Sequence, residues 1–486
     1  MSRFMKELEE RLYQPSVYTG ELYLELHRGT LTNQHEIKRN NRKAEFALRD
    51  LEYMTVRQAV SQHRAADGAE IDPLTELLLI NQFHDILPGT CIPEAHDDAL
   101  RDISGLLAEA GRKTAEIGAS LSDGDGVSVT AVNSLSFERD DVIYLSFEGA
   151  FTEGTYAQQR ITDLNGAQKL AVAGAKIPAF GSLTFRMTGK EEEGESAFRA
   201  EGDSLETPFY QVKFDEKGYL EALTDKRNGR RIRGEGYALN TFLMAEEVPL
   251  SYDNWDVDAD SECKYADTAQ LLSRQVVADG AVEYRIRSTY RLTAASTLTQ
   301  DMIFYAERPE IVFETKMDWQ EDHRFLKAAF DTAVHTDYAS QEIQFGYIRR
   351  PVNRNTSVEK AKFEVSNHKY TDLSETRYGI AVLNDCKYGI SLNGGSMHLS
   401  LHKGGNRPDY RGDKGIHFCT YALLPHLGSM DAENVIRPAY LLNEKPIIVS
   451  GHMPLESLLS IRCAQCHCGD CEACGGCWEL LCGAAV

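Results

Sequence analysis

The spacing of apolar residues changes once along the chain, near residue 125. Between His35 and Leu121 apolar residues recur three and four positions apart, which is the period of amphipathic helices. This pattern predicts three helices, at about residues 35–64, 72–86 and 93–121, with Pro73 at the start of the second. Short links between them predict a three-helix bundle over residues 35–122, and the Gly- and Asp-rich end of this region predicts a linker.

The following region, residues 127–460, carries short apolar runs separated by Gly, Asn and Asp. Such runs are typical of strands, and their number predicts a large all-β sandwich region. The clearest runs are Val127–Val132, Tyr210–Phe214, Val282–Leu292, Glu310–Trp319 and Ile380–Leu383. The expected fold class is therefore α+β and multidomain, with a helical bundle followed by a β-sandwich region.

The first 34 residues follow a third pattern. Residues 1–14 predict a short charged helix. Apolar and polar residues then alternate from Tyr18 to His27, which predicts a half-buried strand that ends at Arg28. One face of this strand is apolar and the other is polar; the polar face consists of Glu21, Tyr23, Glu25 and His27.

Charge and composition narrow the function classes. The net charge is −22 and the sequence pI is about 5.1, which argues against a nucleic-acid binder because such a protein needs a basic face. No run of about 18 apolar residues occurs, so no membrane span is expected. The first ten residues lack the apolar stretch of a signal peptide. We therefore expect a cytoplasmic protein, and 486 residues allow about two to four domains.

Cysteine is distributed unevenly. Four cysteines are scattered, as in a reducing compartment, whereas seven lie in the last 24 residues with overlapping C-x-x-C spacings. That spacing alone would indicate zinc or an iron–sulfur cluster. The seven are Cys463, Cys466, Cys468, Cys471, Cys474, Cys477 and Cys482.

The strongest chemical motif is Asn81–Thr90. His84 and Asp85 stand side by side at the end of the apolar helical run Leu74–Ile86, and a Pro-Gly pair follows. A neutral imidazole is a good zinc ligand, and a neighbouring carboxylate can bind sugar hydroxyls or support the metal. The pair predicts half of a metal or sugar site.

These residues, together with several other segments, resemble glycoside hydrolase family 38, the retaining α-mannosidases, in their bacterial and cytosolic branch. The resemblance covers Tyr18–Ser460 and rests on segments that occur in the family's order. They are residues 20–30, 82–90, 252–258, 345–351, 354–357 and 383–389.

The resemblance implies an N-terminal α/β domain with a His-x-Asp zinc pair and an Asp nucleophile, then a three-helix bundle with a further zinc-binding His, then a galactose-mutarotase-like β-supersandwich. Residues 1–34 would then be a remnant of the catalytic domain, 35–122 the bundle and 127–460 the β region. The chain is expected to be a fragment that lacks the α/β domain.

The resemblance stops after Ile461, where the cysteine-rich tail begins. With one choice of codons, a one-base shift from Arg462 onward gives a continuation that resembles the family. Out-of-frame translation is therefore expected for residues 461–486, and a metal cluster stays open as the alternative.

The resemblance also implies roles for individual residues. His84 would bind zinc, and Asp85 would bind sugar hydroxyls or the metal's surroundings. Retaining hydrolysis needs two carboxyl groups about 5–5.5 Å apart, and Glu25 or, second, Glu21 would be the acid/base. The remaining candidates for substrate binding are Tyr23, His27, Arg28, Trp255 and Tyr347; Arg28 could instead pair with Glu25 or Asp85.

The expected function is metal-assisted hydrolysis of terminal α-D-mannosidic linkages with retention. The expected cofactor is zinc, and the expected partner is a mannose-containing oligosaccharide, with a homo-oligomer left open. The chain alone is expected to be inactive. The alternative is a non-catalytic carbohydrate-binding or assembly subunit.

Overall fold

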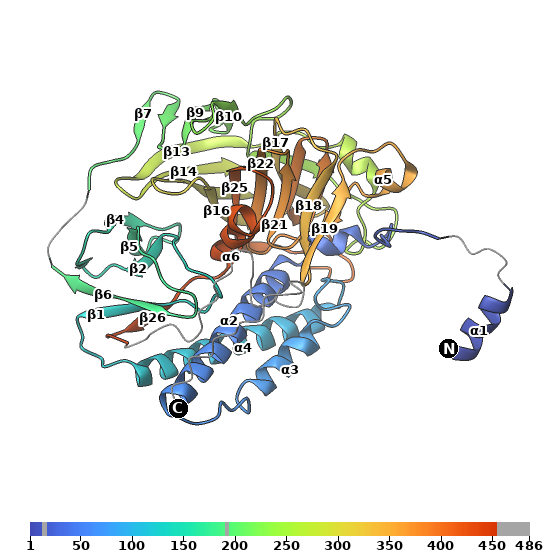
Figure 1. Cartoon of the computed structure of the whole chain (residues 1–486). Coiled ribbons are helices and arrows are strands. Elements are labelled where there is room, and N and C mark those ends of the chain that lie inside the picture. Colours follow the sequence, from blue (N-terminus) through green and yellow to red (C-terminus); the bar gives the residue numbers. More distant parts are fainter. Residues whose placement is uncertain (12–16, 190–193, 454–486) are drawn as a thin grey trace.

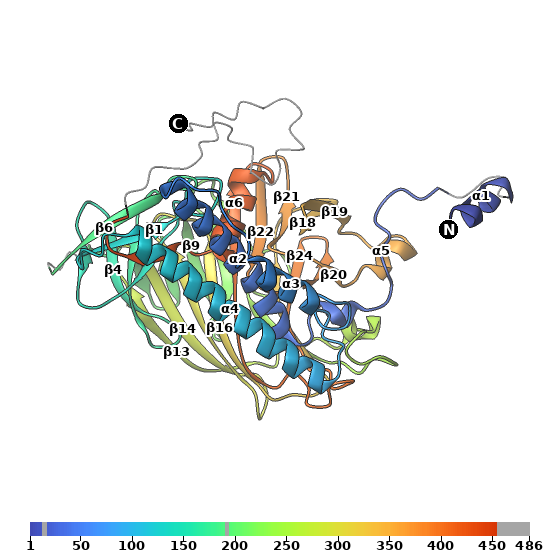
Figure 2. The ribbon, with the colours of Figure 1, turned by 90° about the horizontal axis from the view of Figure 1, so that it is seen from below.

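Helices and sheets occupy separate parts of the molecule. The computed structural model describes residues 1–11, 17–189 and 194–453, and in it three long helices lie along one side of a body made of β-sheets (Figure 1). Viewed from below, two of these helices run side by side across the sheets (Figure 2). The expected mixture of a helical part and a β-rich part is confirmed, while the finer bundle and mutarotase-like supersandwich stay predictions.

The three helices are α2 (His35–Ser61), α3 (Asp72–Asn81) and α4 (Pro93–Leu121). The bounds predicted for the third helix match α4. The helices bury a shared apolar stripe, because their apolar residues fall three and four positions apart. Its fully buried members are Ile37, Ala44, Leu48, Leu78, Ala99, Ile103 and Leu106.

The predicted second helix, residues 72–86, is too long. In the structure α3 ends at Asn81, so His84 and Asp85 lie in a series of turns and not on the helix. Pro88 has no N–H to donate and disfavours a helical conformation at the residue before it. Gly89 then takes a positive φ of 78°, which reverses the chain.

Two small sheets lie beside the helices. One has the order β26 (Ile447–Ser450), β1 (Ser128–Val132), β6 (Ser182–Thr188) and β3 (Phe151–Thr152). The other has the order β2 (Ile143–Ser146), β5 (Gln168–Ala173) and β4 (Ala157–Thr162). Ile143, Leu170 and Phe185 pack between the two sheets.

Three larger sheets form the rest of the described β region. The widest has the order β13 (Gln270–Asp279), β14 (Glu283–Arg291), β15 (Thr297–Tyr305), β16 (Ile311–Trp319), β25 (Gly415–Leu427), β22 (Tyr378–Asn384), β21 (Tyr370–Ser374), β18 (Tyr338–Ile343) and β19 (Gly346–Pro351). A second has the order β12 (Thr241–Glu246), β17 (Arg324–Asp331), β24 (Ser396–Lys403), β23 (Gly389–Asn393) and β20 (Val365–Ser366). A third has the order β11 (Arg230–Arg231), β10 (Leu220–Asp225), β9 (Tyr210–Phe214), β8 (Ser204–Glu206) and β7 (Arg199–Glu201).

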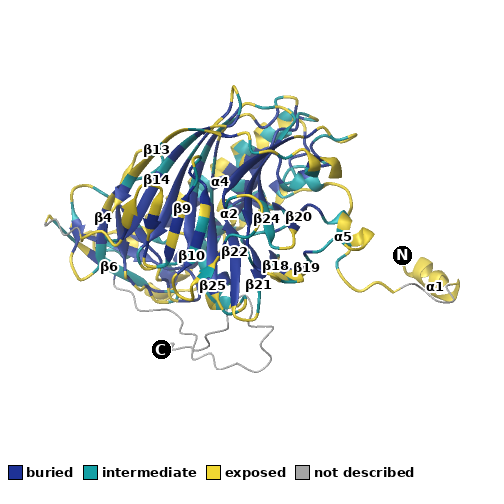
Figure 3. Ribbon diagram, turned by 90° about the horizontal axis from the view of Figure 1, so that it is seen from above, coloured by how far each residue is buried: buried dark blue, intermediate teal, exposed yellow. Residues whose placement is uncertain are grey.

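The widest sheet is buried on both faces near its centre (Figure 3). Side chains alternate across a strand, so neighbours in sequence enter different cores. On β16, Phe313 enters the core shared with β12, β17 and β24, whereas Val312 enters the core on the opposite face. On the paired strand β25, Tyr421 and Ala422 divide in the same way.

One attachment of the helices to the β region is the last described strand, β26. Met54 of α2 packs with Val132 of β1 and Val449 of β26. Gly118 of α4 lies so close that an added Cβ would come within 2.9 Å of the Val449 side chain. The short helical elements that complete the described chain are η1 (Arg28–Leu31), η2 (Ala259–Cys263), α5 (Ser357–Ala361), η3 (Ala432–Ile436) and α6 (Arg437–Asn443).

At the N-terminal end, the predicted charged helix is present as α1 (Ser2–Arg11), with every residue at least partly open to solvent. The strand predicted for Tyr18–His27 is wrong, because residues 17–27 are irregular. Its apolar face is turned outward: Leu22, Leu24 and Leu26 are 87%, 58% and 55% exposed. The physical reason is that two side chains of its polar face have partners in the β region: Glu21 pairs with Arg350, and the Tyr23 hydroxyl donates to the Glu364 carbonyl oxygen.

None of the helices in the described ranges combines the length and the apolar character that crossing a membrane requires. The cysteine-rich tail, and the reading-frame interpretation attached to it, lie outside the described residues.

Candidate functional site

Three of the sequence motifs meet at one hydrogen-bonded place, which we call the junction: residues 27–34, 84–90 and 252–258. The Asn33 side-chain amide donates to the Asn254 carbonyl oxygen. The Asn254 amide in turn donates to the Gly89 carbonyl oxygen over 3.1 Å, and both asparagines are buried. Segments more than 160 residues apart in sequence are therefore held in direct contact.

Two glycines allow this contact. A Cβ on Gly29 would lie 2.7 Å from the Asp256 carbonyl oxygen and 2.9 Å from that of Asn254. A Cβ on Gly89 would lie 2.6 Å from the Cβ of Gln34. Backbones approach this closely only where no side chain intervenes.

The turn after α3 presents His84 and Asp85 to solvent. His84 Nε2 lies 3.4 Å from Asp85 Oδ2, and the two side chains are 74% and 48% exposed. Thr90 orients the carboxylate by donating its hydroxyl to Asp85 Oδ1 over 2.8 Å. The imidazole also packs against the Phe83 ring, with centroids 4.4 Å apart.

Lys38 of α2 hydrogen-bonds to the backbone of this turn. Its buried amine donates to the carbonyl oxygens of Leu87 and Pro88 over 3.1 and 3.0 Å. It also donates to the carbonyl and side-chain oxygens of Asn33, over 2.7 and 3.1 Å. Burial lowers the pKa of Lys38 to about 7 against the opposing effect of Asp413.

Glu21 is held in an ion pair. Its two carboxylate oxygens accept from Arg350 Nε and Nη2 over 2.8 and 2.7 Å, and Lys362 Nζ lies 3.4 Å away. Burial alone would raise the pKa of Glu21, but the hydrogen bonds and charges of Arg350 and Lys362 outweigh it, so the pKa is lowered. A carboxyl held ionised in this way is poorly suited to donate a proton.

Arg28 acts as a clamp on its own segment. Its guanidinium donates to the Tyr23 hydroxyl over 3.1 Å, to the Ala361 carbonyl oxygen over 2.8 Å and to the Glu25 carbonyl oxygen. It also lies 4.4 Å from the centroid of the Phe363 ring. The pairing with the Glu25 or Asp85 side chain considered from the sequence does not occur in this structure, because backbone carbonyls occupy the guanidinium.

The other candidates of this segment divide into anchored and free groups. The Tyr23 hydroxyl donates to the Glu364 carbonyl oxygen over 2.5 Å, and burial raises the pKa of Tyr23. His27 takes a positive φ of 67° and its N–H donates to Asp256 Oδ1 over 2.6 Å, with its side chain exposed. The Glu25 carboxylate is exposed, with no hydrogen-bond or ion-pair partner among the described residues.

The two aromatic candidates differ in their relation to the junction. Trp255 belongs to it, since its carbonyl oxygen accepts the N–H of Gly29 over 2.8 Å and its ring meets Tyr252 edge-on. Tyr347 lies on β19, is 52% exposed, and forms no hydrogen bond or ring contact with the junction in the described part of the chain. The structure joins Tyr347 to the site only through its strand, which also carries Arg350, the partner of Glu21.

Sequence reasoning missed the residues that build the junction: Asn33, Lys38 and Asn254. Asn254 lies inside the segment 252–258, which sequence reasoning singled out for Trp255. The segment was found, but the residue that builds the junction was not named. Lys38 follows Ile37 on the buried side of α2, and a lysine at such a position is itself a signal, since buried amines need several acceptors.

Comparisons with known proteins agree on one family. The family model "Glycosyl hydrolases family 38 C-terminal domain" matches residues 205–411, and "Alpha mannosidase middle domain" matches residues 25–121. Together they take in well over half of the chain. The chain therefore belongs to glycoside hydrolase family 38, of which it carries the middle and C-terminal domains.

Individual relatives support this assignment. Human alpha-mannosidase 2C1 is 33% identical over 447 residues, which are 90% of this chain and 41% of the relative. Alpha-mannosidase G of Dictyostelium discoideum is 29% identical and matches 91% of this chain and 44% of its own length. This chain thus spans less than half of the length of these relatives.

A solved structure shares the fold. An alpha-mannosidase from Enterococcus faecalis V583 superposes with a TM-score of 0.75 at 15% identity, over 94% of this chain and 63% of that one.

The family implies a divalent metal, and the geometry of the turn suits one. Ligand atoms of a zinc ion with bonds of about 2.0–2.2 Å lie about 3.3–3.6 Å apart, and the 3.4 Å between His84 Nε2 and Asp85 Oδ2 agrees. Thr90 orients the carboxylate, as outer partners of metal ligands do. His84 and Asp85 therefore fit two positions of a metal site that needs at least one more protein ligand.

Proposed function

We propose that this chain supplies the middle and C-terminal part of a metal-assisted, retaining α-mannosidase that removes terminal α-D-mannose from oligosaccharides. The observation that carries the proposal is the junction. It binds the turn with His84 and Asp85, the segment with Glu25 and the loop with Trp255 into one hydrogen-bonded unit. The α-mannosidase names of the relatives support the substrate class.

In this proposal, His84 is a metal ligand, and Asp85 either takes the neighbouring ligand position or binds a mannose hydroxyl or a water held by the metal. Zinc bound there would hold mannose hydroxyls and favour distortion of the sugar ring. The Trp255 ring offers an apolar face for sugar C–H groups at the edge of the same unit.

Of the two candidate carboxyl groups, we assign the acid/base role to Glu25. Glu21 is held ionised by Arg350, whereas the Glu25 carboxylate is exposed and has no partner in the described part of the chain. Retaining hydrolysis needs a second carboxyl about 5–5.5 Å from the acid, as nucleophile. That residue would come from the α/β domain that the resemblance implies.

The compartment we propose is the cytoplasm. All four cysteines within the described residues are free thiols, and two of them, Cys386 and Cys419, are buried beside each other in the core. Free thiols are typical of reducing compartments.

A chimera tests the function. The N-terminal part of human alpha-mannosidase 2C1 that lies outside the match is joined to this chain in place of its first residues. This chain alone should release no product from an aryl α-mannoside, because a covalent route without its nucleophile loses nearly all of its rate. The chimera should hydrolyse it, and proton NMR should show α-mannose as the first product.

Variants of the chimera assign the site. His84→Ala should lower kcat/KM by at least about 100-fold, since lost metal ligation removes several kcal/mol of charge stabilisation. His63→Ala, at an exposed position beyond the other end of α2, is the matched control and should be neutral. A folded chimera that binds mannosides without turning them over would refute the proposal in favour of a carbohydrate-binding subunit.

A further inference from the structure

A second group of metal-ligand side chains lies beneath the junction, inside the protein. His402 is near the end of β24, His417 is near the start of β25, and Asp413 lies in the loop between these strands. They are 0%, 7% and 5% exposed. Asp413 Oδ2 accepts the backbone N–H of His35, the first residue of α2, over 2.7 Å, so the group joins the helices to the sheets.

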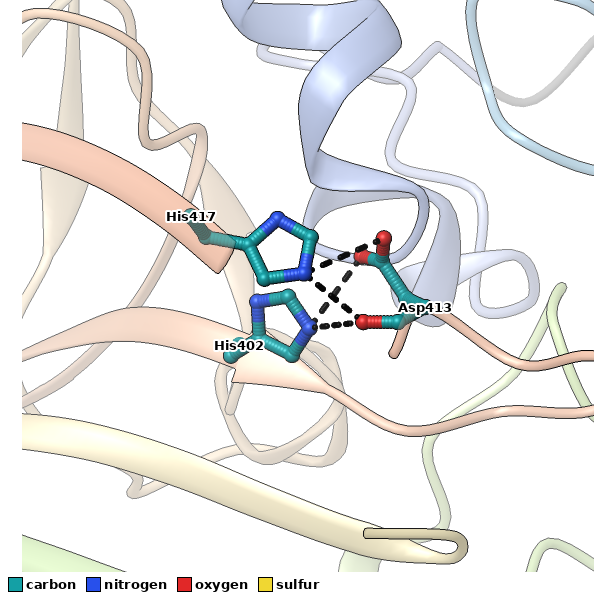
Figure 4. A group of neighbouring side chains, drawn as sticks. All are labelled: His402, Asp413 and His417. Carbon is teal, nitrogen blue, oxygen red and sulfur yellow. Dashed lines mark hydrogen bonds and ion pairs between the residues drawn. The ribbon is translucent and has the colours of Figure 1, made fainter. Parts of the chain in front are cut away.

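The two imidazoles turn the same nitrogen toward one aspartate (Figure 4). His402 Nε2 lies 3.0 Å from the Asp413 carbonyl oxygen and 3.3 Å from Oδ2. His417 Nε2 lies 2.8 Å from that carbonyl oxygen and 3.8 Å from Oδ1. Two nitrogens, a carboxylate and a carbonyl oxygen thus surround one point.

These separations suit a small cation at that point. A tetrahedral zinc ion with bonds of about 2.0–2.2 Å places its ligand atoms about 3.3–3.6 Å apart. The distances from the imidazole nitrogens to the Asp413 oxygens run from 2.8 to 3.8 Å and bracket this value. Little movement of the side chains is therefore needed.

The charges favour a cation as well. The carboxylate of Asp413 is buried and lies between the two buried imidazoles. Among the described residues, Asp413 forms no ion pair with a lysine or an arginine. The amine of Lys387 instead binds His35 Nδ1 over 2.8 Å and the Leu401 carbonyl oxygen. A buried carboxylate without a cationic partner is costly.

We propose that His402, Asp413 and His417 bind a divalent transition metal, zinc by preference, as a closed structural site that fixes the start of α2 against β24 and β25. Two imidazole nitrogens exclude calcium and magnesium, which prefer oxygen ligands, and suit zinc. With the carbonyl oxygen as fourth ligand no position is open, as in structural and unlike catalytic zinc sites.

The site has a direct connection to the junction. His35, which bonds Asp413, follows Gln34 and Asn33, and these contact Gly89 of the turn. A metal in the buried site would therefore fix the chain that positions His84 without touching substrate.

Metal analysis of the full chain tests the proposal. The seven tail cysteines are replaced by serine in every sample, so that the C-x-x-C spacings of the tail bind no zinc. Protein produced with zinc should retain one equivalent through dialysis against a chelator, because the site is buried, and should release it on unfolding. X-ray absorption of this retained zinc should show nitrogen and oxygen neighbours that include imidazoles.

Three variants identify the ligands. His402→Gln and His417→Gln should each weaken zinc binding by more than about 100-fold, since even the loss of an outer partner costs about 10–100-fold. His84→Gln, which removes the exposed imidazole of the junction, should leave the retained equivalent unchanged.

Two results would overturn the proposal, independently of whether the chain acts on mannosides. One is the absence of retained zinc in the parent protein, which needs no variant to fold. The other is zinc that is lost in His84→Gln and kept in His402→Gln, which would place the metal at the turn.

Discussion

Lys38 is the side chain whose removal tests how the junction is built. It is 4% exposed, and its amine donates to four oxygens at 2.7 to 3.1 Å, two on Asn33 and one each on Leu87 and Pro88. Methionine at this position keeps most of the volume and removes all of these bonds. The perturbation is therefore confined to hydrogen bonding.

The expected magnitude follows from the acceptors that remain. A buried acceptor without a partner costs about 1–3 kcal/mol. Asn33 is 1% exposed, whereas Leu87 and Pro88 are half-buried, so water can replace part of the loss at the turn. Removal of the buried amine also recovers part of its desolvation cost. We expect a net local loss of about 2–4 kcal/mol.

Amide hydrogen exchange measures this loss where it occurs. The N–H groups of Gly89 and Thr90 donate to the carbonyl oxygens of Ile86 and Asp85 over 2.9 and 3.0 Å. In Lys38→Met their exchange should be about 30- to 1,000-fold faster. Lys43→Met, the same change at an exposed position of α2, should leave them unaffected. Exchange within about threefold of the parent protein in Lys38→Met would refute the reasoning.

Titration gives a second readout of the same side chain. The pKa of Lys38 is lowered to about 7 by burial, below the value of about 10.4 in an unfolded chain. Between these values the unfolded chain binds the proton more tightly, so the free energy of unfolding rises with pH. The stability of the parent protein relative to Lys38→Met should therefore increase from about pH 7 to pH 10. A flat difference in urea denaturation would contradict the assigned burial.

Three further substitutions test neighbouring parts of the site. Glu21→Gln should cost about 1–3 kcal/mol, because it leaves the buried Arg350 charge unpaired, and residues 17–30 should become more sensitive to protease. Since the pKa of Glu21 is lowered, the same release should appear in the parent protein as the pH falls below the ordinary carboxyl range. Gly89→Ala should cost more than about 2 kcal/mol in thermal unfolding, whereas Gly111→Ala, on an open part of α4, should stabilise slightly. In the chimera, Glu25→Gln should slow substrates with poor leaving groups by about 10²–10⁴-fold; if Glu21→Gln does so instead, Glu21 is the acid.

Periodicity predicted the long elements well, because each hides one continuous stripe or face. The bounds of α4 and of β9 follow from the spacing of their own apolar residues, which mark one buried face of each element. The same reasoning failed at Tyr18–His27. The alternation there is real, but Glu21 and Tyr23 of the polar side contact Arg350 and Glu364, which are more than 320 residues away. No local pattern states which face of an alternating segment meets the rest of the protein.

In the candidate site, too, local motifs could be found from the sequence, whereas groups assembled by long-range contacts could not. The motif around His84 could be found because its residues are adjacent in sequence, although the helix ends at Asn81, earlier than the apolar run suggests. The buried group of His402, Asp413 and His417 could not. His402 and His417 lie on β24 and β25, which belong to different sheets. Only the packing of the two sheets brings the imidazole nitrogens close to Asp413. The signal available was a histidine four positions after an aspartate, which is too common to single out.

The pairing of β1 with β26 has a consequence for synthesis on the ribosome. Val129 lies opposite Ser450, so the strand that follows the helices waits for a partner made more than 300 residues later. At about 5–20 residues per second, that delay is roughly 15–65 seconds. During it, Gly118 of α4 and Met54 of α2 lack the Val449 side chain that covers them in the finished protein. The nascent helices therefore expose apolar surface for most of translation, and a chaperone that shields it would raise the yield of folded chain.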